Sequence, residues 1–140
     1  MPSPARVEGA NAGAALNYLI VFLGGGIGSM LRHGVNLGAA RFLGTGFPYG
    51  TLTVNITGSI VMGLLAGYFA FKSGSSAQSW RLFLMTGVLG GYTTFSAFSL
   101  DAILLYERGQ LAMALGYIAA SGAVSIFGLF AGLMLIRQFT

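Results

Sequence analysis

Four long windows without a charged side chain constrain the fold of this chain more than any other feature. They are Gly9–Leu31, Phe42–Phe71, Leu82–Leu100 and Gln110–Ile136. Each is near or above the roughly 20 residues that a membrane-spanning helix needs. Charged residues make up only 7% of the chain, against about 25% in average soluble domains. The sequence therefore predicts an all-α membrane protein with four transmembrane helices.

Turn residues set the expected boundaries of these helices. We expect helices over Leu16–Ala39, Tyr49–Lys72, Trp80–Tyr106 and Gln110–Gln138. Glycine and serine clusters, with Pro48 before the second helix, favour short connections between them. The chain then divides into a flexible N-terminal tail over residues 1–15 and a four-helix transmembrane domain over residues 16–138. It has no cysteine, which excludes disulfides and thiolate metal sites.

The basic residues bear on orientation in the membrane. With four spans, one side carries Arg6, Lys72, Arg81 and Arg137, and the other carries Arg41, Arg108 and, if it points outward, Arg32. Four against three is a weak bias, so insertion in both orientations and an antiparallel dimer are allowed. If Arg32 is buried, four against two would suffice for one fixed orientation. The net charge of +4 fits basic loops beside lipid headgroups, and no nucleic-acid partner is expected.

Glycine is abundant, at 23 of 140 residues. Pairs of glycines four residues apart occur on every span: Gly24 with Gly28, Gly63 with Gly67, Gly87 with Gly91, and Gly128 with Gly132. Such pairs let helix backbones approach closely in lipid. For any single pair, packing within one bundle is favoured over a contact between subunits. A bundle of 14.5 kDa has little interior, however, so that a pore would need more than one copy.

The third window contains an unusual polar run, GGYTTFSAFSLD, from Gly90 to Asp101. Polar groups at bilayer depth are costly unless they face a partner, a cavity or an ion. Phe95 and Phe98 stand three residues apart and share one helix face. The run, which includes Thr94 and Ser99, indicates a permeation or binding path.

Two further sets of polar residues lie in the second and fourth spans. Asn55, in GTLTVNITGS, offers amide donors and an acceptor, and a helix–helix hydrogen bond is the alternative role. Tyr117, Ser121 and Ser125 recur at every fourth position and form one polar stripe, although serines often bond only to their own helix. Hydroxyls, an amide and the positive edges of phenyl rings suit a small anion. This chemistry does not identify the ion.

No catalytic site is indicated. The glycine run Gly24–Ser29 follows no strand and has no acid about 20 residues on, so close helix packing is favoured over dinucleotide binding. His33 is the only histidine, which excludes a convincing metal site and favours an interfacial side chain. The sequence lacks a plausible triad or carboxylate pair. The chain is therefore not expected to be an enzyme.

The segments GGGIGSMLRH, GTLTVNITGS and GGYTTFSAFS resemble those of the Fluc fluoride channels, also called CrcB proteins. The resemblance covers almost the whole chain after the tail. It implies a channel that exports fluoride passively and confers fluoride resistance, in the cytoplasmic (inner) membrane of a prokaryote. It also implies a dual-topology homodimer with two antiparallel pores and a break in the third helix.

The resemblance also implies roles for individual residues. The fluoride path would be lined by Asn55, Phe95, Phe98, Thr94, Ser99, Tyr117, Ser121 and Ser125. Backbone carbonyls of Gly90 and Thr93 would bind a structural sodium ion (Na+) at the dimer interface, and Arg32 would lie in a vestibule. Ala97 replaces an expected hydroxyl residue, and Asp101 replaces the usual glutamate. For Asp101, a salt bridge or interfacial contact is favoured over gating.

Two other functions are weighed against this one. A small dual-topology multidrug-type exporter would need an acid within the first span, which has none after Glu8. An assembly subunit without transport would explain the glycines but would leave Asn55 and the polar run without a purpose.

Overall fold

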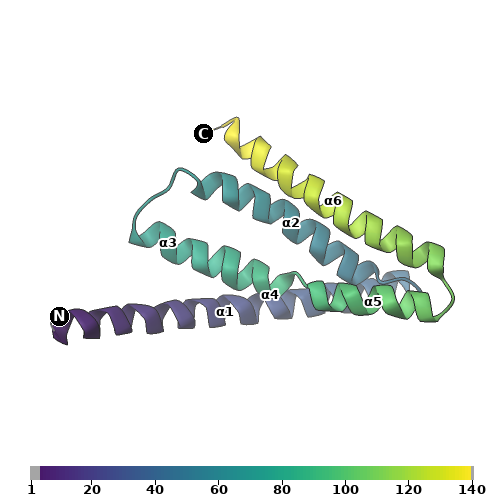
Figure 1. The fold of residues 1–140 in the computed structure, drawn as a ribbon, viewed down its shortest axis with the longest axis horizontal. Helices are drawn as coiled ribbons and strands as arrows, with labels where there is room; N and C mark the ends of the chain where they lie inside the picture. Colours follow the sequence, from purple (N-terminus) through teal and green to yellow (C-terminus); the bar gives the residue numbers. More distant parts are fainter. Residues whose placement is uncertain (1–3, 140) are drawn as a thin grey trace.

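The computed structural model describes residues 4–139, which form helices joined by short connections (Figure 1). In chain order these are α1 (Pro4–Leu43), α2 (Tyr49–Phe69), α3 (Ser75–Arg81), the π-helix η1 (Leu82–Leu89), α4 (Gly90–Tyr92), α5 (Phe95–Glu107) and α6 (Leu111–Arg137). The segments α3, η1, α4 and α5 follow one another closely and make up the third span.

Four helical segments are long and apolar enough to cross a membrane. They are Asn11–Leu43, Tyr49–Phe69, Ser75–Glu107 and Leu111–Arg137. The prediction of an all-α, multi-pass membrane protein with four spans is confirmed. The first helix is longer than expected, because residues 4–15, the larger part of the predicted tail, form its first turns. Residues 1–3 of the predicted tail lie outside the described residues.

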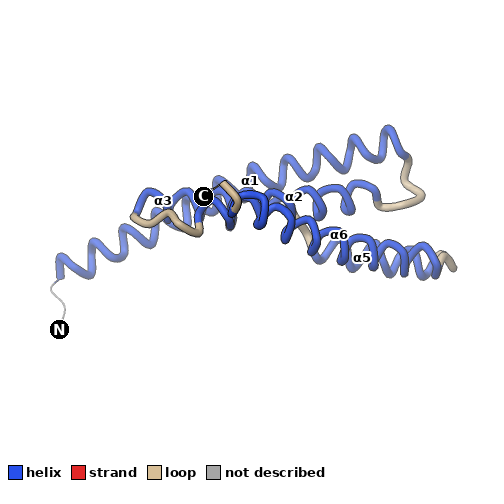
Figure 2. Tube along the Cα trace, turned by 90° about the horizontal axis from the view of Figure 1, so that it is seen from above, coloured by secondary structure: helices blue, strands red, loops and turns tan. Residues whose placement is uncertain are grey.

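The spans form two close pairs, which in the view of Figure 1 diverge toward the end that carries both termini. One pair consists of α1 and the first half of the third span, and the other consists of α2 and α6. Both termini of the described chain and the α2–α3 connection lie at the diverging end. The α5–α6 turn lies at the opposite end, where, seen from above, α1 and the α1–α2 connection stand apart from α5 and α6 (Figure 2).

Glycines explain why the two helices of each pair are so close. A methyl group added at Gly24 would lie 2.6 Å from the carbonyl oxygen of Phe83, and one added at Gly28 would collide with the backbone of Val88. Between α2 and α6, Gly63 likewise faces the backbone of Leu129. All four glycine pairs found in the sequence contact another helix of the same chain, which agrees with their favoured role in packing within one bundle.

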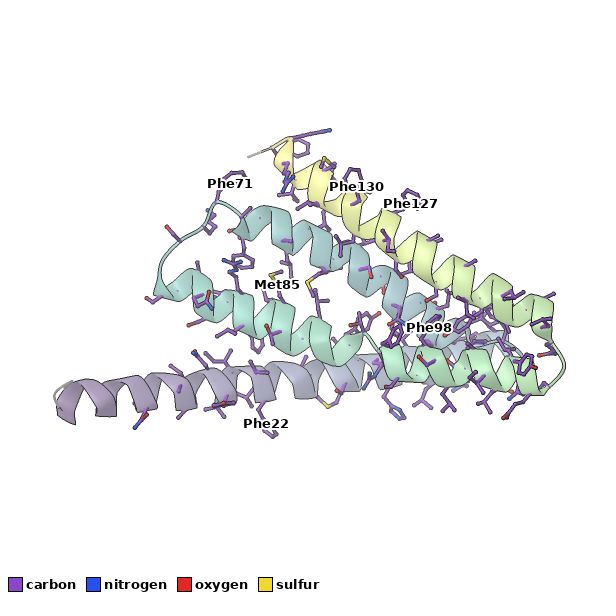
Figure 3. The ribbon with its side chains drawn as sticks, in the orientation of Figure 1. Phe22, Phe71, Met85, Phe98, Phe127 and Phe130 are labelled. Atoms are coloured by element: carbon purple, nitrogen blue, oxygen red, sulfur yellow. The ribbon has the colours of Figure 1, made fainter. Side chains whose placement is uncertain are left out.

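The interior is small and much apolar surface points outward. The buried cluster between α5 and α6 consists of Ala102, Leu105, Ala114 and Tyr117. By contrast, Phe22 on α1 is 74% exposed and Phe127 on α6 is 72% exposed, and both point away from the bundle (Figure 3). Surface of this kind is what lipid or a second chain would cover.

Candidate functional site

The third span loses its helical backbone at two threonines. Thr93 (φ −82°, ψ 160°) and Thr94 (φ −155°, ψ 125°) are both extended, and α5 begins again at Phe95. The hydroxyl oxygen of Thr94 accepts a hydrogen bond from the backbone N–H of Ala97 at 3.2 Å, which caps α5. We call Thr93 and Thr94 the extended pair.

Asn55 of α2 pairs with both backbone groups of Thr94. Its Nδ2 donates to the Thr94 carbonyl at 2.9 Å, and its Oδ1 accepts from the Thr94 N–H at 2.8 Å. In a continuous helix the Thr94 N–H would donate to the carbonyl of Gly90, four residues earlier. The side chain of Asn55 therefore replaces a helical hydrogen bond. This is the interhelical bond that was the alternative role for Asn55, made here with backbone groups.

The carbonyl of Thr93 is also released from helical bonding. In a continuous helix it would accept from the N–H of Ala97, which here donates to the Thr94 hydroxyl. It accepts instead from Nη1 of Arg32 at 3.2 Å. Arg32 is half-buried, and its guanidinium lies at the C-terminal end of α4, where a helix dipole favours positive charge.

A groove of about 400 Å³ opens beside the extended pair. It is lined by residues of three spans: Asn55, Gly58, Ser59, Met62, Thr93, Thr94, Phe95, Phe98, Ser121, Gly122, Ser125, Ile126 and Leu129. We call it the central groove. None of these described residues is acidic. The structure thus gathers six of the eight residues predicted for the fluoride path, all except Ser99 and Tyr117.

Aromatic rings continue from the central groove toward the α5–α6 end. The ring centroids of Phe95 and Phe98 are 5.5 Å apart, and those of Phe98 and Tyr117 are 5.3 Å apart. Phe95 is 79% exposed, whereas Tyr117 is fully buried. Phe98 lies near the start of α5 (Figure 3). The shared face predicted for Phe95 and Phe98 is present in the structure.

Tyr117 links this row of rings to the one acidic residue of the polar run. Its hydroxyl donates to Oδ2 of Asp101 at 3.3 Å. Asp101 also lines a second cavity of about 200 Å³, together with Phe47 and Arg108. The contact made by Asp101 is therefore with a tyrosine inside the same chain.

The three serines predicted for the path differ in their surroundings. Ser121 is buried. The hydroxyl of Ser125 is buried and has no hydrogen-bond partner among the described residues. Ser99 donates to the carbonyl of Phe95 at 2.9 Å, within its own helix. Ser125 is thus the buried hydroxyl that remains available to a ligand.

Two contacts at this site were not anticipated from the sequence. The hydroxyl of Thr57 on α2 lies 3.0 Å from the hydroxyl of Tyr92, and Gly58 packs against the side chain of Thr93. Thr57 and Gly58 follow Asn55 closely on α2. The second half of GTLTVNITGS therefore contacts three successive residues of the polar run, Tyr92, Thr93 and Thr94. The TVNIT stretch could have signalled this contact, because it places three polar side chains at bilayer depth.

Metal-binding side chains are not clustered in the part of the chain that the structure describes, where no group of three or more His, Cys, Asp or Glu residues occurs. His33 is exposed.

The sequence has close relatives among known proteins. Residues 19–133 match the sequence model of a family described as "CrcB-like protein, Camphor Resistance (CrcB)". A protein of Rhodopseudomonas palustris (strain BisB5) named fluoride-specific ion channel FluC is 65% identical, over 89% of this chain and all of its own length. One of Nitrobacter hamburgensis named fluoride-specific ion channel FluC 2 is 61% identical over the same shares. A third, from Methylobacterium nodulans, is named fluoride-specific ion channel FluC and is 59% identical over 89% of this chain and 98% of its own length.

Proposed function

Because the chain belongs to the CrcB-like family, we propose that it is a fluoride-selective channel that lets fluoride leave the cell passively. It would work in the cytoplasmic membrane of a prokaryote as an antiparallel homodimer with two pores. Its curated relatives are named as ion channels, in agreement with the prediction that the chain is not an enzyme. The observation that carries the proposal is the central groove, which joins Asn55, Phe95 and Ser125.

The groove has the chemistry that an anion requires and lacks the chemistry that would repel it. The hydroxyl of Ser125 has no partner among the described residues, and Nδ2 of Asn55 retains one hydrogen after its bond to Thr94. The edges of the Phe95 and Phe98 rings carry partial positive charge. The first N–H groups of α5 add the positive end of a helix dipole beside the groove. Several weak donors acting together would offset part of the lost hydration of fluoride.

The remaining predicted path residues extend the route beyond the groove. Phe98 contacts Tyr117, whose hydroxyl lies at Asp101 beside the second cavity. We propose that the ion passes Phe98 and Tyr117 between the two openings, with Ser121 beside it. Asp101 is held by the Tyr117 hydroxyl, which lowers the repulsion that a free carboxylate would exert. Thr94 and Ser99 flank the Phe95 end of the route, and Arg32 supplies positive charge at a vestibule.

A second copy of the chain would complete the site. A groove lined by an amide and hydroxyls is costly to leave open to lipid. Large apolar residues surround it: Phe95 is 79% exposed and Ile126 is 71% exposed. An antiparallel second copy would cover the groove. Arg32 is half-buried and bonded to Thr93, so the basic residues of the two sides stand nearer four against two than four against three.

The carbonyls of Gly90 and Thr93 fit the proposed sodium ion. Both have lost the backbone N–H that would bond to them in a continuous helix, as described above. Hard cations prefer oxygen ligands, and carbonyls at a helix C-terminus attract positive charge. Sodium would supply one positive charge that joins the carbonyls of two copies.

The proposal is tested by fluoride efflux from liposomes, with chloride efflux measured in parallel. Replacing Phe95 and Phe98 together by Ile keeps apolar volume but removes the positive ring edges. We expect an assembled protein whose fluoride flux falls by orders of magnitude. Asn55→Asp should be equally harmful, because a donor becomes a negative charge. Unchanged flux in the assembled double variant, checked by size-exclusion chromatography, would mean that the rings only pack.

A multidrug-type exporter is the second candidate, and the same assay separates it. An exporter would show no fluoride efflux but proton-driven uptake of a lipophilic cation. Family membership favours the channel.

A further inference from the structure

Asn55 and Gly90 are two possible partners for a single hydrogen, the backbone N–H of Thr94. In the structure this N–H donates to Oδ1 of Asn55 at 2.8 Å. The alternative acceptor is the carbonyl of Gly90, which a continuous α-helix would use. Only one of the two acceptors can receive a full hydrogen bond from it.

The return bond strengthens the hold of Asn55 on this position. Nδ2 donates to the carbonyl of Thr94 at 2.9 Å, so both backbone groups of the residue are satisfied by one side chain. Without such a partner, the N–H and the carbonyl of Thr94 would be unsatisfied at membrane depth, which is costly. Closing the helix would then be the cheaper arrangement for the backbone.

We infer that Asn55 is a positioning residue for the cation site: by accepting the Thr94 N–H, it keeps the Gly90 carbonyl free to bind sodium. This inference rests on the proposed function, in which that carbonyl is a sodium ligand. It adds a coupling that the proposed function lacks. The residue that faces the central groove also controls the oxygen that holds the two copies together.

The coupling has a direction that can be measured. In Asn55→Ala the Thr94 N–H has lost its acceptor, and it can return to the Gly90 carbonyl. The carbonyl is then occupied and sodium loses a ligand. Since sodium binds only the folded protein, weaker binding appears as a smaller sodium-dependent rise in the thermal midpoint.

The experiment compares four forms of the full chain in detergent. They are the unaltered chain, Asn55→Ala, the chain with a backbone ester in place of the Thr94 amide, and the combination of both changes. The ester removes the Thr94 N–H and keeps every side chain, but it also makes the Thr93 carbonyl, the other proposed sodium ligand, a weaker one. The form with the ester alone measures that second effect. The readout is the thermal midpoint as sodium replaces N-methylglucamine at constant ionic strength.

We call the sodium concentration that gives half of the maximal rise in the thermal midpoint the sodium midpoint. We expect the sodium midpoint of Asn55→Ala to be at least tenfold higher than that of the unaltered chain. The combined form should recover much of this loss, because no N–H remains to occupy the Gly90 carbonyl. The sodium midpoint of the form with the ester alone should stay within about threefold of that of the unaltered chain. A combined form no better than Asn55→Ala would overturn the inference.

A matched variant separates this role from a general loss of α2 contacts. Thr57→Val removes the other polar contact between α2 and the polar run, the one to Tyr92, and leaves the Thr94 bonds in place. Its sodium midpoint should match that of the unaltered chain. An equal loss in Thr57→Val would mean that Asn55 matters only as part of the packing.

A second measurement holds even if a variant is too unstable for the titration. In lipid bilayers, the carbonyl ¹³C signal of Gly90 should shift in Asn55→Ala as that oxygen accepts a hydrogen bond. An unshifted signal would overturn the inference independently of sodium. If the unaltered chain shows no sodium response but this shift occurs, the proposed sodium site fails while the backbone competition stands.

Discussion

Arg32 donates a hydrogen bond from Nη1 to the carbonyl oxygen of Thr93, 3.2 Å away, and so joins α1 to the extended pair. The same oxygen is a proposed sodium ligand. A guanidinium and a sodium ion would share one carbonyl, and their like charges repel. The structure thus places a fixed positive charge of the protein beside the proposed cation site.

Arg32→Gln should consequently strengthen sodium binding while it weakens fluoride entry. At an effective dielectric typical of proteins, removing one nearby charge is worth about 1 kcal/mol or more, which is about fivefold in sodium affinity. Fluoride flux should fall because the vestibule loses its positive charge. The sodium dependence of the thermal midpoint and liposome efflux measure the two effects.

Arg32→Lys and Arg41→Gln are the controls for this prediction. Lysine keeps the charge, and Arg41 is an exposed residue of the last turn of α1. Both should keep a sodium midpoint close to that of the unaltered chain. Equal midpoints in Arg32→Gln and Arg32→Lys would argue against charge competition.

Gly90→Val should preserve the protomer and abolish its sodium response. A Cβ at Gly90 has only the carbonyl of Met85 within 4 Å, at 3.9 Å, so the protomer has room for it. The branched side chain would instead crowd the proposed cation and second copy. The yield of monodisperse protein and the sodium-dependent thermal shift report on the two effects separately.

Gly87→Val is the matched comparison for Gly90→Val. A Cβ at Gly87 would lie 2.9 Å from the Cα of Gly24, backbone against backbone, so α1 and η1 would be forced apart. This variant should yield little folded protein. If both glycine variants behave alike, Gly90 has no special part in assembly.

Ser125→Ala should stabilise the protein slightly while it lowers fluoride flux. Its hydroxyl is buried without a partner among the described residues, a state that costs about 1 kcal/mol or more. Losing one donor should reduce flux about tenfold, the factor that corresponds to 1.4 kcal/mol. Thermal unfolding and liposome efflux test the two opposite changes. Ser99→Ala should lower flux less, since Ser99 already donates to Phe95; the reverse order would refute this assignment.

Two lysines added between Ser73 and Ser76 should fix the orientation of the chain. This connection lies at the same end as both termini, and added Lys draws that end to the cytoplasm. Flux should fall unless a copy of opposite orientation is co-expressed. The natural chain has no cysteine, so that one cysteine placed near the C-terminus can be labelled from either side. Labelling of the unmodified chain from one side only would contradict dual topology.

Local patterns in the sequence were enough to predict the spans and the residue types of the site. Charge-free windows located four helices, and a three-residue spacing placed Phe95 and Phe98 on one face. Such patterns could not predict which side chains form contacts between residues that are far apart in the sequence. The partner of Asn55 is 39 residues away, and that of Asp101 is found on another helix, so each depends on how the spans pack. The π-helix Leu82–Leu89 was not predicted either, because the residues LFLMTGVL carry no pattern that distinguishes a π-helix from an α-helix.

The use of glycine inside the chain has a consequence for how this protein tolerates mutation. Every glycine pair contacts a helix of the same chain, so larger residues at these glycines should prevent the protomer from folding. In the proposed dimer, bulky outward residues such as Phe95 and Ile126 would then contact the partner copy. A genetic screen should therefore recover two classes of inactive alleles. Changes at the paired glycines should not be rescued by any second copy of the gene. Changes at the outward bulky residues should be rescued by a second copy that carries a compensating change in side-chain size on the facing chain.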